Sequence, residues 1–166
     1  MTFNEKKFIK IYKPWGIILF ERNIKNIEQV SKLVKSIRYI FNDSKYPIFI
    51  DEEGGRVSRL KNIIDSSIFS GEFFGNMCLK NQKKFNINYK VYVDQISYVL
   101  NLIGTNINTV PVLDIKRYFS HKVIGDRAFS SNKKIVDKIG NITIDFFNQN
   151  RIGTVIKHIP GHGLSS

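Results

Sequence analysis

The chain contains one cysteine, Cys78, among its 166 residues. A single cysteine excludes an intrachain disulfide, so nothing indicates the cross-linked fold of a small secreted protein. No stretch approaches the roughly 20 apolar residues of a membrane-spanning helix, and residues 1–10 lack an apolar core of signal-peptide length. We therefore expect a cytoplasmic protein with no membrane segment.

Acidic residues are also scarce, with 14 Asp and Glu against 26 Lys and Arg and a formal charge of +12. A basic surface of this strength can attract nucleic acid or anionic lipid. The lysines, however, are scattered as singles and pairs, without a dense tract or a repeated alternation with aromatic residues. We therefore expect a solvated basic surface and no nucleic-acid partner.

Apolar and aromatic residues are present at the level of a folded protein, 42% and 13% of the chain. The length suits one domain spanning residues 1–166. Four short apolar runs predict buried strands at 16–20, 48–50, 107–113 and 154–156. Apolar spacings of three and four predict helices at 27–41, 89–102 and 133–150, with a long loop or a short helix within 56–80. Alternating strands and helices indicate an α/β fold with a parallel sheet.

Polar residues and glycines follow the second predicted strand in the sequence IDEEGGRVSRL, residues 50–60. Ligands bind at the carboxyl ends of parallel strands, and carboxylates accept hydrogen bonds from sugar hydroxyls. The two glycines allow a sharp turn that points Asp51 into such a site. An equally open interpretation is a helix start with acids near its positive end, paired internally with Arg56 and Arg59.

Two further motifs follow the third predicted strand, PVLDI at 111–115 and IGDRAF at 124–129. Asp114 and Asp126 both lie near Arg127 in sequence, and for Asp126 we predict an ion pair with Arg127 that shapes the loop. Arg127 comes two residues after Gly125 in a loop that we expect to be exposed. Its planar guanidinium suits contact with a ligand oxygen.

The last predicted strand leads into KHIPGHG at 157–163. A lone histidine is more often structural, but Lys157 and His158 are adjacent at a strand end, before a proline and two glycines, which suits ligand contact. A metal site formed by His158, His162 and Asp114 is an alternative. That spacing matches no tight zinc pattern and Cys78 is distant, so we expect neither a metal nor a cofactor.

Together, PWGIILFERN, IDEEGGRVSRL, PVLDI, IGDRAF and KHIPGHG resemble the family 3 glycoside hydrolases in order and separation. They are most similar to the bacterial β-N-acetylhexosaminidases of peptidoglycan recycling. The resemblance implies part of a (β/α)₈ TIM barrel, with the predicted strands as its second to fifth. It also implies that the N-acetylglucosamine unit is held by Asp51, Arg59, Arg127, Lys157 and His158.

The same resemblance implies a retaining reaction in which an aspartate is the nucleophile and a histidine is the acid/base. In the family both residues follow the last motif, so we expect them beyond Ser166 and assign no catalytic residue in this chain. We accordingly expect an incomplete barrel domain that is inactive alone. Its expected ligands are N-acetylglucosamine-containing cell-wall fragments (muropeptides), and its expected protein partner is a separate C-terminal fragment or a second copy.

Two alternatives to a hexosaminidase piece stay open. The first is a sugar-binding remnant without hydrolysis, because the five sugar-holding residues would be present in that case too. A basic nucleic-acid binder rests on charge alone, and we consider it the weaker hypothesis.

Overall fold

Four short parallel strands form one sheet in this computed structural model, which describes residues 1–118 and 122–162. The strand order β1-β2-β3-β4 follows the chain, and every connection between neighbouring strands carries at least one helix. The predicted α/β class with four parallel strands is confirmed. The elements are α1 (Phe3–Tyr12), β1 (Ile17–Leu19), the 3-10 helix η1 (Glu21–Asn23), α2 (Ile27–Phe41), β2 (Ile48–Ile50), α3 (Gly71–Lys80), α4 (Gln82–Ile103), β3 (Ile107–Asn108), the 3-10 helix η2 (Gly125–Arg127), α5 (Lys133–Gln149) and β4 (Gly153–Thr154).

Capping side chains define the ends of the long helices. Asn26 precedes α2 and accepts a hydrogen bond from the backbone N–H of Gln29, and Asn42 ends the helix in a left-handed conformation. The predicted helix at 27–41 is therefore confirmed. Helix α4 is capped by Asn81 and starts before the predicted residue 89. Within the described parts of the chain, no helix combines the length and apolarity that a membrane span requires.

The structure contains two α-helices, α1 and α3, in addition to the three that the apolar spacing predicts. Helix α1 buries only Ile9, so it shows no apolar stripe, although Thr2 and Glu5 form a capping box. Helix α3 is the short helix allowed within 56–80, and its glycines resemble loop residues in sequence. A Cβ at Gly75 would lie 1.6 Å from the carbonyl oxygen of Phe129, so the glycine is required by close packing.

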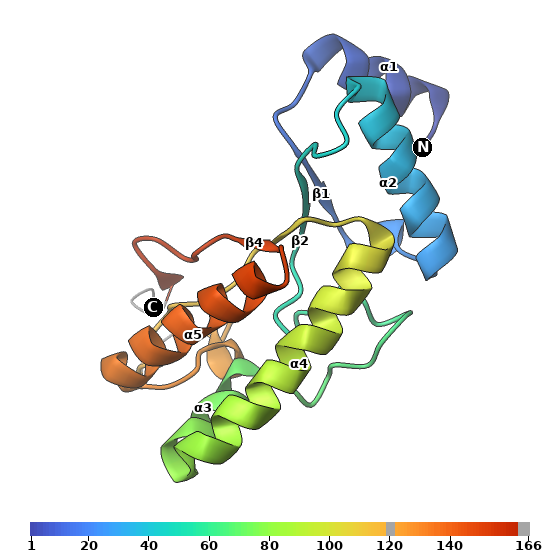
Figure 1. The fold of residues 1–166 in the computed structure, drawn as a ribbon. Coiled ribbons are helices and arrows are strands. Elements are labelled where there is room, and N and C mark those ends of the chain that lie inside the picture. The colour runs from blue at the N-terminus through green and yellow to red at the C-terminus, as the bar shows by residue number, and fades with distance from the viewer. Residues whose placement is uncertain (119–121, 163–166) are drawn as a thin grey trace.

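The helices cover one face of the sheet and leave the other open. Figure 1 shows them following one another around the short strands, with α3 beside α4. Ile48 and Ile50 of β2 point toward the helices and are fully buried. Ile18, Phe49 and Ile107 are register partners on the opposite face, and Ile18 is 41% exposed.

Pairing continues beyond the short strands in the direction of the candidate site. β3 ends at Asn108, earlier than the predicted 113, yet Val112 still forms a parallel bridge with Lys157. The backbone N–H of Lys157 donates to the carbonyl of Pro111 at 3.1 Å, and that of Leu113 donates to the carbonyl of Lys157 at 2.6 Å. These bonds hold the third and fourth loops side by side.

Candidate functional site

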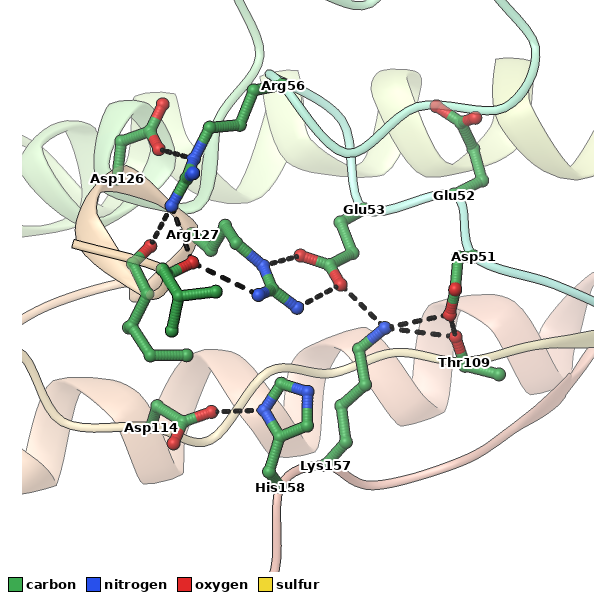
Figure 2. Close-up of polar contacts among 12 residues, drawn as sticks. Asp51, Glu52, Glu53, Arg56, Thr109, Asp114, Asp126, Arg127, Lys157 and His158 are labelled. Carbon is green, nitrogen blue, oxygen red and sulfur yellow. Dashed lines mark hydrogen bonds and ion pairs between the residues drawn. The ribbon is translucent and has the colours of Figure 1, made fainter. Parts of the chain in front are cut away.

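Polar side chains from three neighbouring strand ends meet on the open face of the sheet. Asp51 follows β2, Thr109 follows β3, and Lys157 lies beyond β4. Strand alternation places all three on the same face as the apolar row of Ile18 and Phe49. Figure 2 shows Asp51, Thr109 and Lys157 pointing toward one another. The loops that follow β2, β3 and β4 therefore converge on the open face of the sheet.

Glu52 points the opposite way and has a structural role. Its buried carboxylate accepts hydrogen bonds from the hydroxyls of Ser58 and Ser66, both at 2.9 Å, and from the backbone N–H groups of Arg59 and Leu60, at 2.8 and 3.1 Å. Burial raises the pKa of Glu52, and these hydrogen bonds oppose the shift. The carboxylate thus shapes residues 52–66 into a loop, and no described helix begins there, so the helix-start interpretation is wrong.

The side chains that follow β2, β3 and β4 on the open face of the sheet form what we call the rim. Asp51 is its central carboxylate. Lys157 Nζ lies 3.1 Å from its Oδ1, Arg59 Nη2 lies 3.5 Å from its Oδ2, and the Thr109 hydroxyl donates a short hydrogen bond. Burial by itself would raise the pKa of Asp51. The hydrogen bond from Thr109 and the charges of Lys157 and Arg59 outweigh burial and lower that pKa. Asp51 is therefore an ionised acceptor.

Glu53 joins the two cations predicted to hold the ligand. Arg127 binds its carboxylate through two bonds, Nε at 2.8 Å and Nη2 at 2.9 Å, and Lys157 Nζ lies 2.6 Å away. These contacts surround a side chain that is only 5% exposed. The hydrogen bond to Glu53 is the main cause that raises the pKa of Arg127. All three Nζ donors of Lys157 have acceptors, in Asp51, Glu53 and Thr109.

The predicted ion pair between Asp126 and Arg127 is wrong. Asp126 instead accepts from Arg56 Nε at 2.8 Å, and Arg56 Nη2 also donates to the carbonyls of three loop residues, Lys122, Val123 and Ile124, at 2.8, 2.6 and 3.0 Å. Arg127 is drawn away from Asp126 because Glu53 offers a better-buried acceptor. Arg56 is therefore the residue that ties the 50–60 loop to the 122–127 loop.

His158 is held by the buried carboxylate of Asp114. Its Nδ1 lies 2.6 Å from Asp114 Oδ2, and the backbone N–H of His162 donates to Asp114 Oδ1 at 2.5 Å. The two imidazole rings meet edge to face with centroids 4.6 Å apart. No group of three or more His, Cys, Asp or Glu side chains is arranged to hold a metal within 1–118 and 122–162. Gly163, the last residue of the KHIPGHG motif, lies outside the described residues.

Arg59 retains donors that no described side chain uses. Its only hydrogen bond to a side chain is the long 3.5 Å contact with Asp51, and its buried Nε has no partner among the described residues. The guanidinium lies over the ring of Phe20, 5.6 Å from the centroid, which fixes its plane. Arg59 is thus positioned for a further acceptor.

A recess of about 580 Å³ lies away from the rim, between α1, β1 and α2. Its walls come from α1, β1 and α2 and include none of the rim residues. Its charged groups, Glu5, Lys6, Arg22 and Lys32, are spread along its walls. The strand-end rim is therefore the stronger candidate, because its acceptors and donors converge.

The full length of the chain, residues 1–166, matches the family described as the glycosyl hydrolase family 3 N terminal domain. The chain belongs to this family. Curated relatives include a "Beta-hexosaminidase A" of Pseudoalteromonas piscicida, 32% identical over 95% of this chain, and a "Beta-hexosaminidase" of Hydrogenovibrio crunogenus, 34% identical over 89%. The chain spans 26% and 41% of the length of these two relatives.

Solved structures of family 3 proteins have the same fold. NagZ from Neisseria gonorrhoeae, in complex with N-trifluoroacetyl-D-glucosamine, superposes with a TM-score of 0.85 at 27% identity over 99% of this chain and 48% of its own. A family 3 β-N-acetylglucosaminidase from Paenibacillus superposes with a TM-score of 0.79 at 28% identity, over 98% of this chain and 30% of its own. The resemblance to family 3 glycoside hydrolases is confirmed.

The structure brings together all five predicted sugar-holding residues of this family 3 domain, in two different states. Asp51, Arg59 and His158 keep hydrogen-bonding capacity on the open face, whereas Arg127 and Lys157 are largely engaged by Glu53. That they bind sugar stays a prediction. The predicted set of five sugar-holding residues omits three further residues of the site, Glu53, Thr109 and Asp114. Their position directly after strand ends is the sequence signal that could have identified them.

Proposed function

We propose that this chain forms the substrate-holding part of a retaining β-N-acetylhexosaminidase that removes terminal N-acetylglucosamine from cell-wall muropeptides. The observation that carries the proposal is the convergence of Asp51, Lys157 and His158 at one rim of a family 3 fold (Figure 2), with Arg59 Nη2 3.5 Å from Asp51 Oδ2. The glucosamine derivative bound to the Neisseria protein supports the ligand class. The lone cysteine supports a cytoplasmic setting.

The chemistry of the rim fits a sugar ring. A polyhydroxylated ligand both donates and accepts hydrogen bonds, so its site needs a carboxylate and several N–H donors in fixed places. Asp51 is an ionised acceptor and Arg59 has donors to spare. Lys157 and Arg127 bring two cations to the rim, and Glu53 fixes their positions.

The same geometry favours a binding role over bond cleavage for these residues. A glycosidase needs a proton donor with a raised pKa beside the scissile oxygen. The pKa of Asp51 is lowered, and Glu53 is occupied by Arg127 and Lys157. The acid/base role of the proposed reaction is therefore assigned to neither Asp51 nor Glu53.

Calorimetry with N-acetylglucosamine tests the proposal directly. We expect binding to the 166-residue chain that is lost in Arg59→Ala and retained in Arg56→Ala, because Arg56 serves the loop and not the rim. A chromogenic N-acetyl-β-glucosaminide should bind without turnover. Turnover by this chain would contradict the assignment to binding, and equal binding by both variants would remove the proposed site.

The open face of the sheet supports a protein partner as part of this proposal. Ile18, Trp15 and Val155 are exposed at or beside that face, and large exposed apolar areas mark interfaces. Either a separate C-terminal fragment or a second copy would cover them. Light scattering of the purified chain, with and without such a fragment, distinguishes the two, and a monodisperse monomer that ignores the fragment contradicts both.

A further inference from the structure

Asp114 is a buried carboxylate next to the rim, and its side chain is inaccessible to solvent. Its two oxygens contact different groups on the 158–162 loop: Oδ2 lies 2.6 Å from His158 Nδ1, and Oδ1 accepts a hydrogen bond from the backbone N–H of His162. Asp114 comes from the loop after β3, so the contact joins two strand ends. Its position is therefore well suited to control the imidazole of His158.

The proton on His158 follows from these contacts. A backbone N–H can only donate, so Asp114 Oδ1 must accept, and of a carboxyl group and an imidazole that share one hydrogen bond the carboxyl group is ordinarily the stronger acid and gives up its proton. An ionised Asp114 requires that His158 Nδ1 carries a hydrogen. In the neutral imidazole, Nε2 is then an acceptor.

The second ring nitrogen of His158 faces the site. Figure 2 shows it on the side of the ring away from Asp114, near the side chain of Lys157. Nothing within 1–118 and 122–162 donates a hydrogen bond to Nε2. The imidazole is about a quarter exposed, and its edge-to-face contact with His162 limits its rotation.

The two rim carboxylates, Asp51 and Glu53, and the Thr109 hydroxyl already accept hydrogen bonds from described residues. Glu53 is filled by Arg127 and Lys157, and Asp51 already accepts from Thr109 and Lys157. Every hydroxyl of a sugar must donate its hydrogen somewhere when water is removed. His158 Nε2 supplies a neutral acceptor for one of these hydroxyls.

We propose that Asp114 is a positioning residue that holds His158 as the Nδ1–H tautomer, so that Nε2 accepts a hydrogen bond from a ligand hydroxyl. The inference rests on the proposed function for the identity of the ligand but not for the tautomer. It adds Asp114 to the five predicted residues and states which ring nitrogen of His158 donates a hydrogen bond and which accepts one.

We expect Asp114→Asn to exchange the donor and acceptor roles of the two ring nitrogens of His158. The single amide oxygen can take the place of only one carboxylate oxygen, and of the two described groups on the 158–162 loop the backbone N–H of His162 cannot change into an acceptor. The amide NH₂ therefore faces His158 Nδ1, which becomes the acceptor, and the hydrogen moves to Nε2. The same logic explains how an Asp to Asn change in the Ser-His-Asp triad produces the wrong histidine tautomer.

Nitrogen NMR of ¹⁵N-histidine-labelled protein at mildly alkaline pH tests the proposal. We expect the Nδ1–H pattern for His158 in the unmodified chain and the Nε2–H pattern in Asp114→Asn. The control Asp126→Asn, at the Arg56 ion pair, should leave the pattern unchanged. An Nε2–H tautomer or an imidazolium in the unmodified chain overturns the proposal, even if Asp114→Asn fails to fold.

Calorimetry with N-acetylglucosamine and its monodeoxy analogues supplies the second readout. We expect Asp114→Asn to weaken binding roughly tenfold, and one deoxy analogue to lose that difference between the two proteins, because it lacks the donating hydroxyl. Equal weakening for every analogue overturns the acceptor role. If the unmodified chain binds no N-acetylglucosamine, the proposed function fails while the tautomer result still stands.

Discussion

Glu53 and Glu72 form a matched pair that tests how strongly burial determines the contribution of an ion pair to the free energy of unfolding. Each accepts a lysine nitrogen at 2.6 Å, from Lys157 and Lys116 respectively. The Glu53 side chain is 5% exposed and that of Glu72 is 38% exposed. We predict very different losses of stability when each is replaced by the isosteric glutamine.

The magnitude follows from what each substitution leaves behind. Removing one partner of a buried ion pair costs about 3–5 kcal/mol, because the other charge stays buried without compensation. In Glu53→Gln, Lys157 keeps Asp51 and Thr109, and Arg127 keeps the Val123 carbonyl, so we expect about 2–4 kcal/mol. Glu72→Gln removes a solvated pair worth about 0–1 kcal/mol.

Urea unfolding of both variants and of the unmodified chain measures these free energies. The loss in Glu72→Gln should shrink in high salt, because exposed charges are screened, while the loss in Glu53→Gln should persist. Equal losses for the two variants, or a Glu53→Gln loss below about 1 kcal/mol, would refute the reasoning from burial.

Three further predictions concern the fold around the rim. Gly75→Ala should prevent folding or destabilise it severely, as followed by circular dichroism, because the new Cβ would lie 1.6 Å from the carbonyl oxygen of Phe129. The folded pKa of Asp51 lies below its unfolded value, so its contribution is present above the unfolded pKa and is lost as pH falls through the folded pKa. The stability gap between the unmodified chain and Asp51→Asn should therefore narrow from neutral to strongly acidic pH in urea titrations. Tyr89→Phe should cost about 1 kcal/mol in the same assay, because it removes the buried hydrogen bond to Thr143 at 2.7 Å.

The glycine and tyrosine predictions each have a matched control elsewhere in the chain. Gly153→Ala should be tolerated better, because its Cβ would have no contact closer than 3.4 Å. Tyr39→Phe removes a hydroxyl from an exposed ring and should change stability little. A gap for Asp51→Asn that stays constant with pH, or equal costs for the two tyrosine variants, would contradict the corresponding prediction.

Local patterns were sufficient for much of the fold. Asn26 caps α2 where the apolar spacing begins, and the run at 48–50 forms β2, because caps and apolar spacing depend on residues close together in the chain. Helix α3 was harder to predict, since Gly71 and Gly75 look like loop residues. Their purpose is visible only once residues 127–129 lie against them.

The sequence by itself determined which loops meet, because parallel strands end at one edge of a sheet. It placed Asp51, Lys157 and His158 there. Only the tertiary structure decided the partners of the charges. Glu52 and Glu53 are adjacent and chemically alike, yet one shapes a loop beneath the helices and the other binds Arg127, 74 positions along the chain. Contacts over that separation depend on the packing of the whole sheet, which no local pattern records.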